Sequence, residues 1–184
     1  MKKVVKFGGS SLASAEQFKK VGAIIRSDAG RRFVVPSAPG KRFDKDTKVT
    51  DMLYACYALA AEGKDFGREL RQIEQRYQEI IDGLELKLSL EKEFSLIREN
   101  FAGKAGKDYA ASRGEYLNGI VMANYLGYEF VDAAEVIVFC EDGSFDMDKT
   151  TEVLGERLKD MKNAVIPGFN GALPDGHVIT FSRG

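Results

Sequence analysis

The sequence predicts an α/β fold, a three-layer α/β/α sandwich with a mostly parallel central sheet. Short runs of β-branched residues alternate with long stretches in which apolar residues recur every three or four positions. Strands that are separated by helices are typical of a parallel sheet covered on both faces. The chain has 184 residues, which is long enough for one domain with a sizeable core.

The expected elements follow the chain in order. The predicted strands are 2–7, 33–36, 128–132, 136–139, 164–167 and 178–182. The predicted helices are 13–28, 50–62, 66–82, 89–101, 108–126 and 148–161. The block between about 50 and 126 carries few strand signals, so we expect a helical insertion that covers one end of the sheet. A hairpin-like turn is expected at 174–177.

Composition excludes several classes of function. Lys and Arg total 27 and Asp and Glu total 28, and this balance argues against a nucleic-acid partner. No apolar run is long enough to cross a membrane, and the first residues carry no secretory pattern, so we expect a cytoplasmic protein. Cys56 and Cys140 stand alone among apolar residues, as buried reduced thiols do. With a single histidine, His177, we expect no protein metal site.

The first strand ends in Lys6-Phe7-Gly8-Gly9-Ser10-Ser11. Two glycines allow close approach of the backbone to a ligand, and the N–H groups of a following helix favour an anion. Lys6 adds a charge in a strand where apolar residues are expected, so it must be paired or face a ligand. The pattern indicates a phosphate site, although a plain turn capped by Ser10 or Ser11 is the alternative. Neither G-x-x-x-x-G-K-[ST] nor G-x-G-x-x-G after a strand is present.

A long polar loop follows the second strand, at the sheet edge where α/β proteins bind ligands. It begins at Ser37 and leads to Thr50, which also has the position of a helix N-cap. Loops of this length are usually functional or disordered, and the many charged side chains of 39–48 favour mobility.

Two further segments carry candidate binding residues. Gly114 interrupts a predicted helix, which indicates close backbone approach or a ligand, because glycine destabilises a helix interior. The neighbouring Glu115 is either a ligand-binding carboxylate or the partner of Arg113 or Lys107 in an ion pair. Arg183 follows the last strand beside a glycine and could bind a carboxylate with two parallel hydrogen bonds.

Together these segments resemble aspartate kinases, members of the amino acid kinase family. The chain carries Lys6-Phe7-Gly8-Gly9-Ser10-Ser11 for their K-F-G-G-[TS]-S signature and Ser112-x-Gly114-Glu115 for their S-x-G-E element. Ser37-Ala38 leads to the helix start at Thr50, as their serine-alanine turn does. Gly168-Phe169 and the final 180–184 match the approach to R-G-G-S-D. The four motifs occur in the family's order and imply the amino acid kinase (carbamate kinase-like) fold.

The resemblance implies transfer of the γ-phosphoryl group of ATP to the side-chain carboxylate of L-aspartate, with Mg²⁺ held mainly by the phosphates. Lys6 would be catalytic, and Gly8, Gly9 and Ser10 would bind phosphate. Glu115 would receive the substrate ammonium, Arg183 its α-carboxylate, and Ser37 and Thr50 would add hydrogen bonds, giving the set of substrate-binding residues Ser37, Thr50, Glu115 and Arg183. The family also implies a homo-oligomer.

The chain stops inside the last motif. We therefore expect residues 1–184 to be the N-terminal portion of a catalytic domain, without the nucleotide-binding half and the regulatory domains, and inactive alone. Two alternatives stay open at this point. One is another amino acid kinase, acting on glutamate, N-acetylglutamate or a nucleoside monophosphate. The other is a non-catalytic module that binds an amino acid.

Overall fold

A four-stranded parallel sheet forms the centre of the molecule in the computed structural model, which describes residues 1–181. Its strands, in spatial order, are β1 (Lys3–Phe7), β2 (Arg31–Pro36), β4 (Ala164–Val165) and β3 (Glu129–Phe130). All three strand pairs are parallel. β1 is an edge strand, and its Val4 is 69% exposed. The predicted parallel sheet is confirmed.

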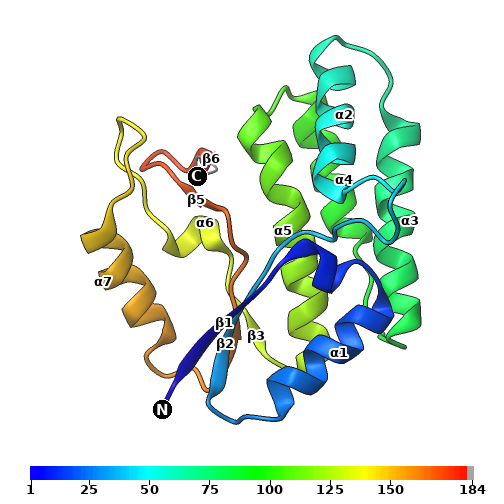
Figure 1. Ribbon diagram of the computed structural model, residues 1–184. Coiled ribbons are helices and arrows are strands. Elements are labelled where there is room, and N and C mark those ends of the chain that lie inside the picture. Colours follow the sequence, from blue (N-terminus) through cyan, green and yellow to red (C-terminus); the bar gives the residue numbers. More distant parts are fainter. Residues whose placement is uncertain (182–184) are drawn as a thin grey trace.

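Helices cover both faces of this sheet, which gives the three predicted layers (Figure 1). α1 (Ala15–Arg26) and α5 (Lys107–Leu126) lie on one face. α6 (Ala133–Val136) and α7 (Met147–Leu158) lie on the other. Successive residues of β2 supply the two cores, since Val34 packs with α1 and α5 whereas Phe33 packs with α6 and α7. This alternation is the expected two-residue period of a strand buried on both faces.

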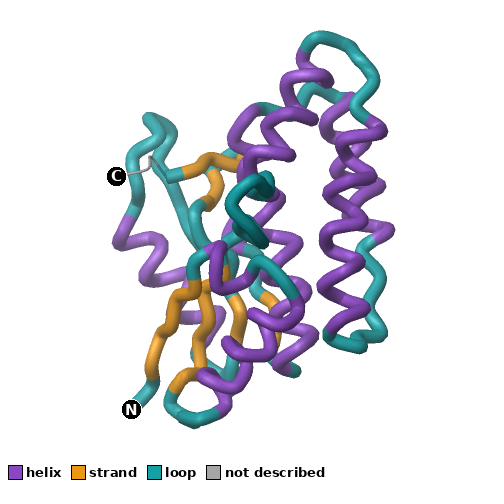
Figure 2. Tube along the Cα trace, turned by 45° about the vertical axis from the view of Figure 1, so that its right-hand side comes forward, coloured by secondary structure: helices purple, strands orange, loops and turns teal. Residues whose placement is uncertain are grey.

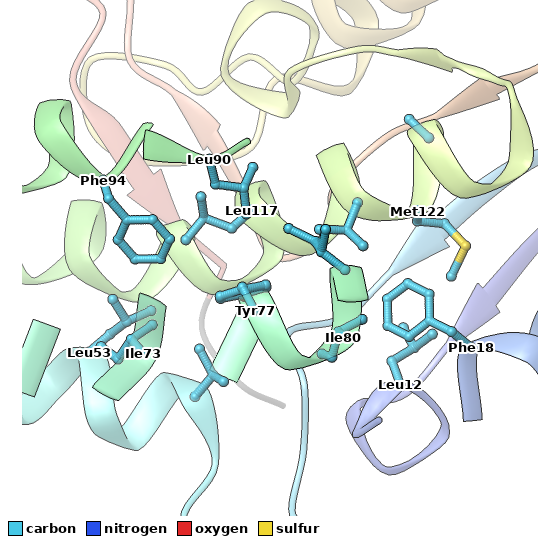
Figure 3. Close-up of a cluster of buried hydrophobic side chains, with 14 of the residues drawn as sticks. Leu12, Phe18, Leu53, Ile73, Tyr77, Ile80, Leu90, Phe94, Leu117 and Met122 are labelled. Carbon is cyan, nitrogen blue, oxygen red and sulfur yellow. The ribbon is translucent and has the colours of Figure 1, made fainter. Parts of the chain in front are cut away.

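Three more helices extend the structure beyond α5, away from the sheet (Figure 1). They are α2 (Val49–Ala61), α3 (Gly67–Gly83) and α4 (Glu91–Ala102). Their apolar faces join the core of α1 and α5 rather than forming a separate one. Figure 3 shows the fully buried Tyr77 of α3 in the middle of this cluster, between Phe94 and Ile80. The helical block is therefore continuous with the body of the domain.

A short antiparallel hairpin, β5 (Asn170–Ala172) and β6 (Val178–Thr180), lies apart from the strands of the main sheet (Figure 2). Gly176 in its turn has a φ of +88°, which glycine adopts without strain. The hydroxyl of Thr180 donates to Asp108 in the first turn of α5 at 2.9 Å, which ties the hairpin to that helix. The predicted turn at 174–177 is thus confirmed.

The long helices all occur where the apolar spacing predicts them, but one strand prediction is wrong. Residues 136–139 do not form a strand of the sheet. Asp132 accepts a hydrogen bond from the backbone N–H of Ala134 and begins the short helix α6, in which Val136 is buried. Only isolated bridges follow, from Val138 to Ala172 and from Phe139 to Phe145. The 178–182 prediction also differs, because β6 pairs with β5 outside the main sheet.

The helix starts also differ from the capping predictions. The glycine turn leads into a 3₁₀ helix, η1 (Gly9–Leu12), and Ser14 rather than Ser10 or Ser11 caps α1 by accepting from the backbone N–H of Gln17. Lys48 precedes α2, so Thr50 lies inside its first turn. Each polar side chain near these starts offers a similar local signal, and tertiary packing selects among them.

No helix in the described part of the chain is long and apolar enough to span a bilayer. Both cysteines are free thiols. Cys56 is fully buried on α2, whereas Cys140 is partly exposed. Burial raises the pKa of the Cys56 thiol to about 12, so this side chain is a neutral core residue.

Candidate functional site

The carboxyl ends of β1 and β2 lie side by side, and the chain leaves both of them into polar turns. Phe7 and Pro36 are paired in register at the ends of the strands. The backbone N–H of Ser37 donates to the carbonyl of Phe7 at 3.0 Å, so the two turns are joined where the strands end. Ligands of open α/β sheets bind at this edge.

A cleft of about 450 Å³ opens at this position. It is lined by Gly9, Ser10, Ser37, Ala38, Pro39, Gly40, Lys41, Lys48, Thr50 and Glu115. The structure therefore brings together five residues that the sequence selects: Gly9, Ser10, Ser37, Thr50 and Glu115. They come from η1, from the loop after β2, from α2 and from α5, which are far apart in the sequence.

Glycines allow the walls of the cleft to approach closely. The N–H of Gly40 donates to the carbonyl of Gly9 at 2.8 Å, and a Cβ on Gly40 would lie 2.6 Å from the carbonyl carbon of Gly9. On the other side, a Cβ on Gly114 would lie 2.7 Å from the Cβ of Ala38. Gly114 thus serves close approach of α5 to the loop, the first of the two roles that its position in a helix indicates.

Glu115 and Thr50 place polar groups in largely buried surroundings. Glu115 is 8% exposed and Thr50 is 7% exposed, and both line the cleft. The hydroxyl of Tyr77 on α3 donates to the carbonyl of Gly114 at 2.7 Å, which fixes α5 next to Glu115. Burial raises the pKa of Tyr77 well above its usual value, so this hydroxyl keeps its proton as a donor.

The two cations considered as partners of Glu115 have other contacts. The guanidinium of Arg113 lies between the rings of Tyr109 and Tyr116, 4.6 and 4.4 Å from their centroids. It also donates to the hydroxyl of Ser112. Lys107 lies over the ring of Tyr54 at 5.2 Å. Contacts with aromatic rings therefore help to hold both cations in place.

The other predicted residues lie at or beyond the margin of the cleft. Gly8 is exposed and begins η1 with an extended backbone. Lys6 is exposed on the edge strand β1 and does not line the cleft. Its amine has no hydrogen-bond or ion-pair partner among residues 1–181. An edge strand leaves a lysine accessible, which is why Lys6 needs no internal counter-charge here. Arg183 lies outside the described residues.

Several residues of the site were not selected from the sequence. Lys41 and Lys48 line the cleft and add two cations to it. The side-chain amide of Asn118, one turn after Glu115, donates to the carbonyl of Ser37 at 2.7 Å and joins α5 to the loop. Asn118 lies in the polar segment that carries Glu115, and the two lysines lie in the charged loop after β2. The sequence signal for these three residues was therefore only that they are close to residues already selected for the site.

The loop between β2 and α2 is anchored rather than loose, contrary to the mobility that its composition favours. Asp46 accepts from Arg42 within the loop at 2.9 Å and pairs with Arg76 of α3 at 3.0 Å. The hydrogen bond from the Arg42 guanidinium lowers the pKa of the Asp46 carboxyl, whereas burial raises it. Together with the charge of Arg76, the hydrogen bond holds this pKa well below its usual range. Asp46 is therefore ionised at neutral pH.

Among residues 1–181, the cleft combines two lysines, one carboxylate and three hydroxyls (Ser10, Ser37 and Thr50). Such a set suits a ligand that carries both anionic groups and an amine. Residues 1–181 contain no group of three or more His, Cys, Asp or Glu side chains placed to hold a metal ion. Any divalent cation here would depend on oxygens of the ligand.

Comparison with known proteins adds the family. The model of the amino acid kinase family matches residues 1–184. Aspartokinase 3 of Bacillus subtilis (strain 168) is 37% identical over an alignment of 196 residues. The alignment covers 98% of this chain and 43% of the relative. The chain thus spans less than half of the length of this curated relative.

Solved structures of aspartate kinases are also similar to this chain. The aspartate kinase of Clostridium acetobutylicum superposes with a TM-score of 0.96 at 50% identity, covering 100% of this chain and 42% of the other. E. coli aspartokinase III, in complex with aspartate and ADP, superposes with a TM-score of 0.79 at 23% identity, covering 100% and 44%. The same enzyme with lysine and aspartate gives 0.76. At this lower identity the likeness shows the fold alone.

Proposed function

Because this chain belongs to the amino acid kinase family, we propose that its cleft is the amino-acid and phosphoryl site of an aspartate kinase. The reaction would transfer the γ-phosphoryl group of ATP to the side-chain carboxylate of L-aspartate. The observation that supports it most directly is the convergence of Gly9, Ser10, Ser37, Thr50 and Glu115 on one cleft. Similarity to aspartate kinases over almost the whole chain supports the choice of substrate.

The proposed roles follow from the chemistry of each group. The ammonium of aspartate would bind the Glu115 carboxylate, and the hydroxyls of Ser37 and Thr50 would hydrogen-bond the substrate. The N–H groups of Gly8, Gly9 and Ser10 would bind phosphate oxygens. Arg183 would bind the α-carboxylate. A carboxylate nucleophile is ionised at neutral pH, so the reaction needs no general base.

Lys6 would stabilise charge on the transferred phosphoryl group. In that step a side-chain oxygen of aspartate bonds to the γ-phosphorus, and the bond to the bridging oxygen of ADP breaks. Catalysis then consists of alignment and charge stabilisation. Mg²⁺ would arrive with ATP as part of the substrate. The exposed amine of Lys6 is accessible for this role at the end of β1.

We propose further that residues 1–184 are the N-terminal portion of the kinase domain. The parts that bind the nucleotide base and regulatory effectors would lie in the remainder, and the whole enzyme would be a homo-oligomer. The relatives, of which this chain covers 42–44%, support this division.

The test uses the full-length protein that carries this segment. Lys6→Ala should lower kcat at least about 100-fold, the loss typical of removing a group that stabilises transition-state charge. Glu115→Gln should raise KM for aspartate at least tenfold and leave KM for ATP within twofold. Lys2→Ala, an exposed lysine nearby, is the control that should behave as wild type. Full turnover by Lys6→Ala would refute the role of Lys6.

A substrate panel separates this proposal from its rivals. L-Aspartate should be phosphorylated, whereas L-glutamate, N-acetyl-L-glutamate and nucleoside monophosphates should not. A buried carboxylate at Glu115 suits a free ammonium group but not an acetylated nitrogen. Aspartate binding without phosphoryl transfer in the full-length protein would favour the non-catalytic module instead.

A further inference from the structure

Two consecutive residues of α3, Arg76 and Tyr77, hold the opposite walls of the cleft although α3 does not line it. Tyr77 binds the carbonyl of Gly114 beside Glu115. Arg76 binds the other wall, at the loop after β2. We propose that Arg76 is a positioning residue that sets the loop 37–48 against the phosphate-binding turn at Gly9. This inference rests on the proposed function of the cleft.

Arg76 is built for this task by its surroundings. It is 4% exposed and binds groups at the end of η1 and in both halves of the loop after β2. Its Nη2 donates to the carbonyl of Gly40 at 2.6 Å and to that of Ala13 at 3.4 Å. Its Nη1 pairs with Asp46 at 3.0 Å and donates to the carbonyl of Thr47 at 3.4 Å. One guanidinium thus joins the end of η1 to both halves of the loop.

The contact with Gly40 reaches the site directly. Gly40 lies against Gly9 with no room for a side chain between them, and its N–H donates to the Gly9 carbonyl at 2.8 Å. Displacement of Gly40 therefore moves Gly9 or breaks this hydrogen bond. Because phosphoryl transfer depends on alignment, a shift of about 1 Å at such a turn lowers the rate about 100-fold.

Asp46 supplies the matching charge. Its side chain is 8% exposed and accepts from both Arg76 and Arg42. Arg42 in turn pairs with Glu79, one turn of α3 beyond Arg76, at 3.0 Å. The loop is therefore fastened to α3 by two ion pairs through Asp46 and Arg42. A buried arginine without Asp46 would keep its charge but lose its only carboxylate partner among residues 1–181.

Lysine cannot replace arginine in this arrangement. A guanidinium is planar and donates in several fixed directions, whereas an ammonium is a single point of charge on a flexible stem. The acceptors of Arg76 lie on Ala13 at the end of η1 and on Gly40 and Asp46 in the two halves of the loop after β2. Arg76→Lys would keep the charge without spanning them, so we expect it to behave like Arg76→Met.

The experiment compares Arg76→Met, Arg76→Lys and the control Arg71→Met in the full-length protein. Arg71 is an exposed arginine of the same helix. Trypsin reports on the loop independently of activity, because Lys41, Arg42 and Lys45 are exposed cleavage sites within it. Cleavage sites are identified by mass spectrometry, and kinetics are measured at a temperature where circular dichroism shows each variant to be folded.

We expect both Arg76 variants to be cleaved in the loop at least tenfold faster than wild type, with kcat at least tenfold lower. Arg71→Met should stay within twofold on both measures. A merely structural role would lower the melting temperature and leave kcat of the folded protein unchanged. Wild-type cleavage and wild-type kcat in a folded Arg76→Met protein would overturn the proposal, as would full rescue of kcat by lysine.

If Arg76→Met does not fold, Asp46→Asn decides, because Asp46 lies in the loop and outside the helix core. We expect at least fivefold faster cleavage and at least threefold lower kcat, and unchanged values would overturn the proposal. If the wild-type protein does not phosphorylate aspartate at all, the proposed function fails. The trypsin rates then still show whether Arg76 holds the loop, so the two failures are distinguishable.

Discussion

Gly114→Ala tests the close approach of α5 to the loop after β2. Whether this substitution raises or lowers the free energy of unfolding depends on one neighbouring atom, the Cβ of Ala38. A Cβ at this position would lie 2.7 Å from the Cβ of Ala38, whereas carbon atoms pack best at about 3.5–4.0 Å. Overpacking of this kind costs about 1–3 kcal/mol. Replacement of glycine by alanine in a helix gains about 1 kcal/mol. We therefore expect a net destabilisation of about 1 kcal/mol.

The same substitution should stabilise the protein when Ala38 is first changed to glycine. The next nearest atoms are Leu53 Cδ1 at 3.4 Å and Val49 Cγ1 at 3.6 Å, which are ordinary contacts. Gly114→Ala in the Ala38→Gly background should then gain about 1 kcal/mol from helix propensity. The coupling between the two positions is expected to be about 2 kcal/mol, with a reversal of sign.

Urea unfolding followed by circular dichroism measures these free energies. Circular dichroism is suitable because the chain has no tryptophan whose fluorescence could report unfolding. Gly155→Ala in α7 is the matched control, because nothing lies within 4 Å of the added Cβ. It should stabilise by about 1 kcal/mol. The reasoning would be refuted if Gly114→Ala changed stability equally in both backgrounds, to within about 0.5 kcal/mol.

Three other perturbations test parts of the same architecture. Tyr77→Phe removes the hydroxyl that binds the Gly114 carbonyl, and urea unfolding should show a loss of about 1 kcal/mol; an unchanged midpoint would contradict this. Asp46 has a depressed pKa in the folded state, so its contribution to stability is present above the ordinary aspartate pKa and is lost as pH falls below it. Asp46→Asn should therefore flatten the loss of stability measured between about pH 4 and pH 2, and an identical acid profile would argue against the buried pair. Iodoacetamide should modify Cys140 in the native protein and reach Cys56 only on unfolding, because burial raises the Cys56 pKa to about 12; mass spectrometry that finds Cys56 alkylated first would contradict its burial.

The sequence was sufficient for the layers and for much of the cleft. Long helices such as 108–126 carry enough periodic apolar residues to be predicted, and the structure has α5 at Lys107–Leu126. The cleft residues could be selected because parallel strands place their carboxyl ends at one edge, and the resemblance to a family adds Glu115 and Thr50. Local patterns and strand order together bring these residues to one place.

What the sequence could not supply depends on long-range contacts. The run 136–139 has the composition of a strand, yet capping by Asp132 and burial of Val136 make its beginning helical. The course of the loop 39–48 is set by Arg76, which lies about thirty residues later, and a charged loop gives no local sign of such a partner. Lys41 and Lys48 reach the cleft for the same reason.

The position of β1 at the rim of the sheet affects how this chain behaves by itself. One side of the strand presents backbone N–H and C=O groups to solvent, and Val4 adds an exposed apolar side chain. An exposed edge strand can pair with the same strand of a second molecule, and natural proteins oppose this pairing with charged side chains such as lysine. Lys3 is paired with Asp28 at 2.6 Å, whereas Lys6 lies two residues along the strand from Val4 and would repel its counterpart on a second copy. Added salt weakens this repulsion, so self-association of the chain should grow with ionic strength.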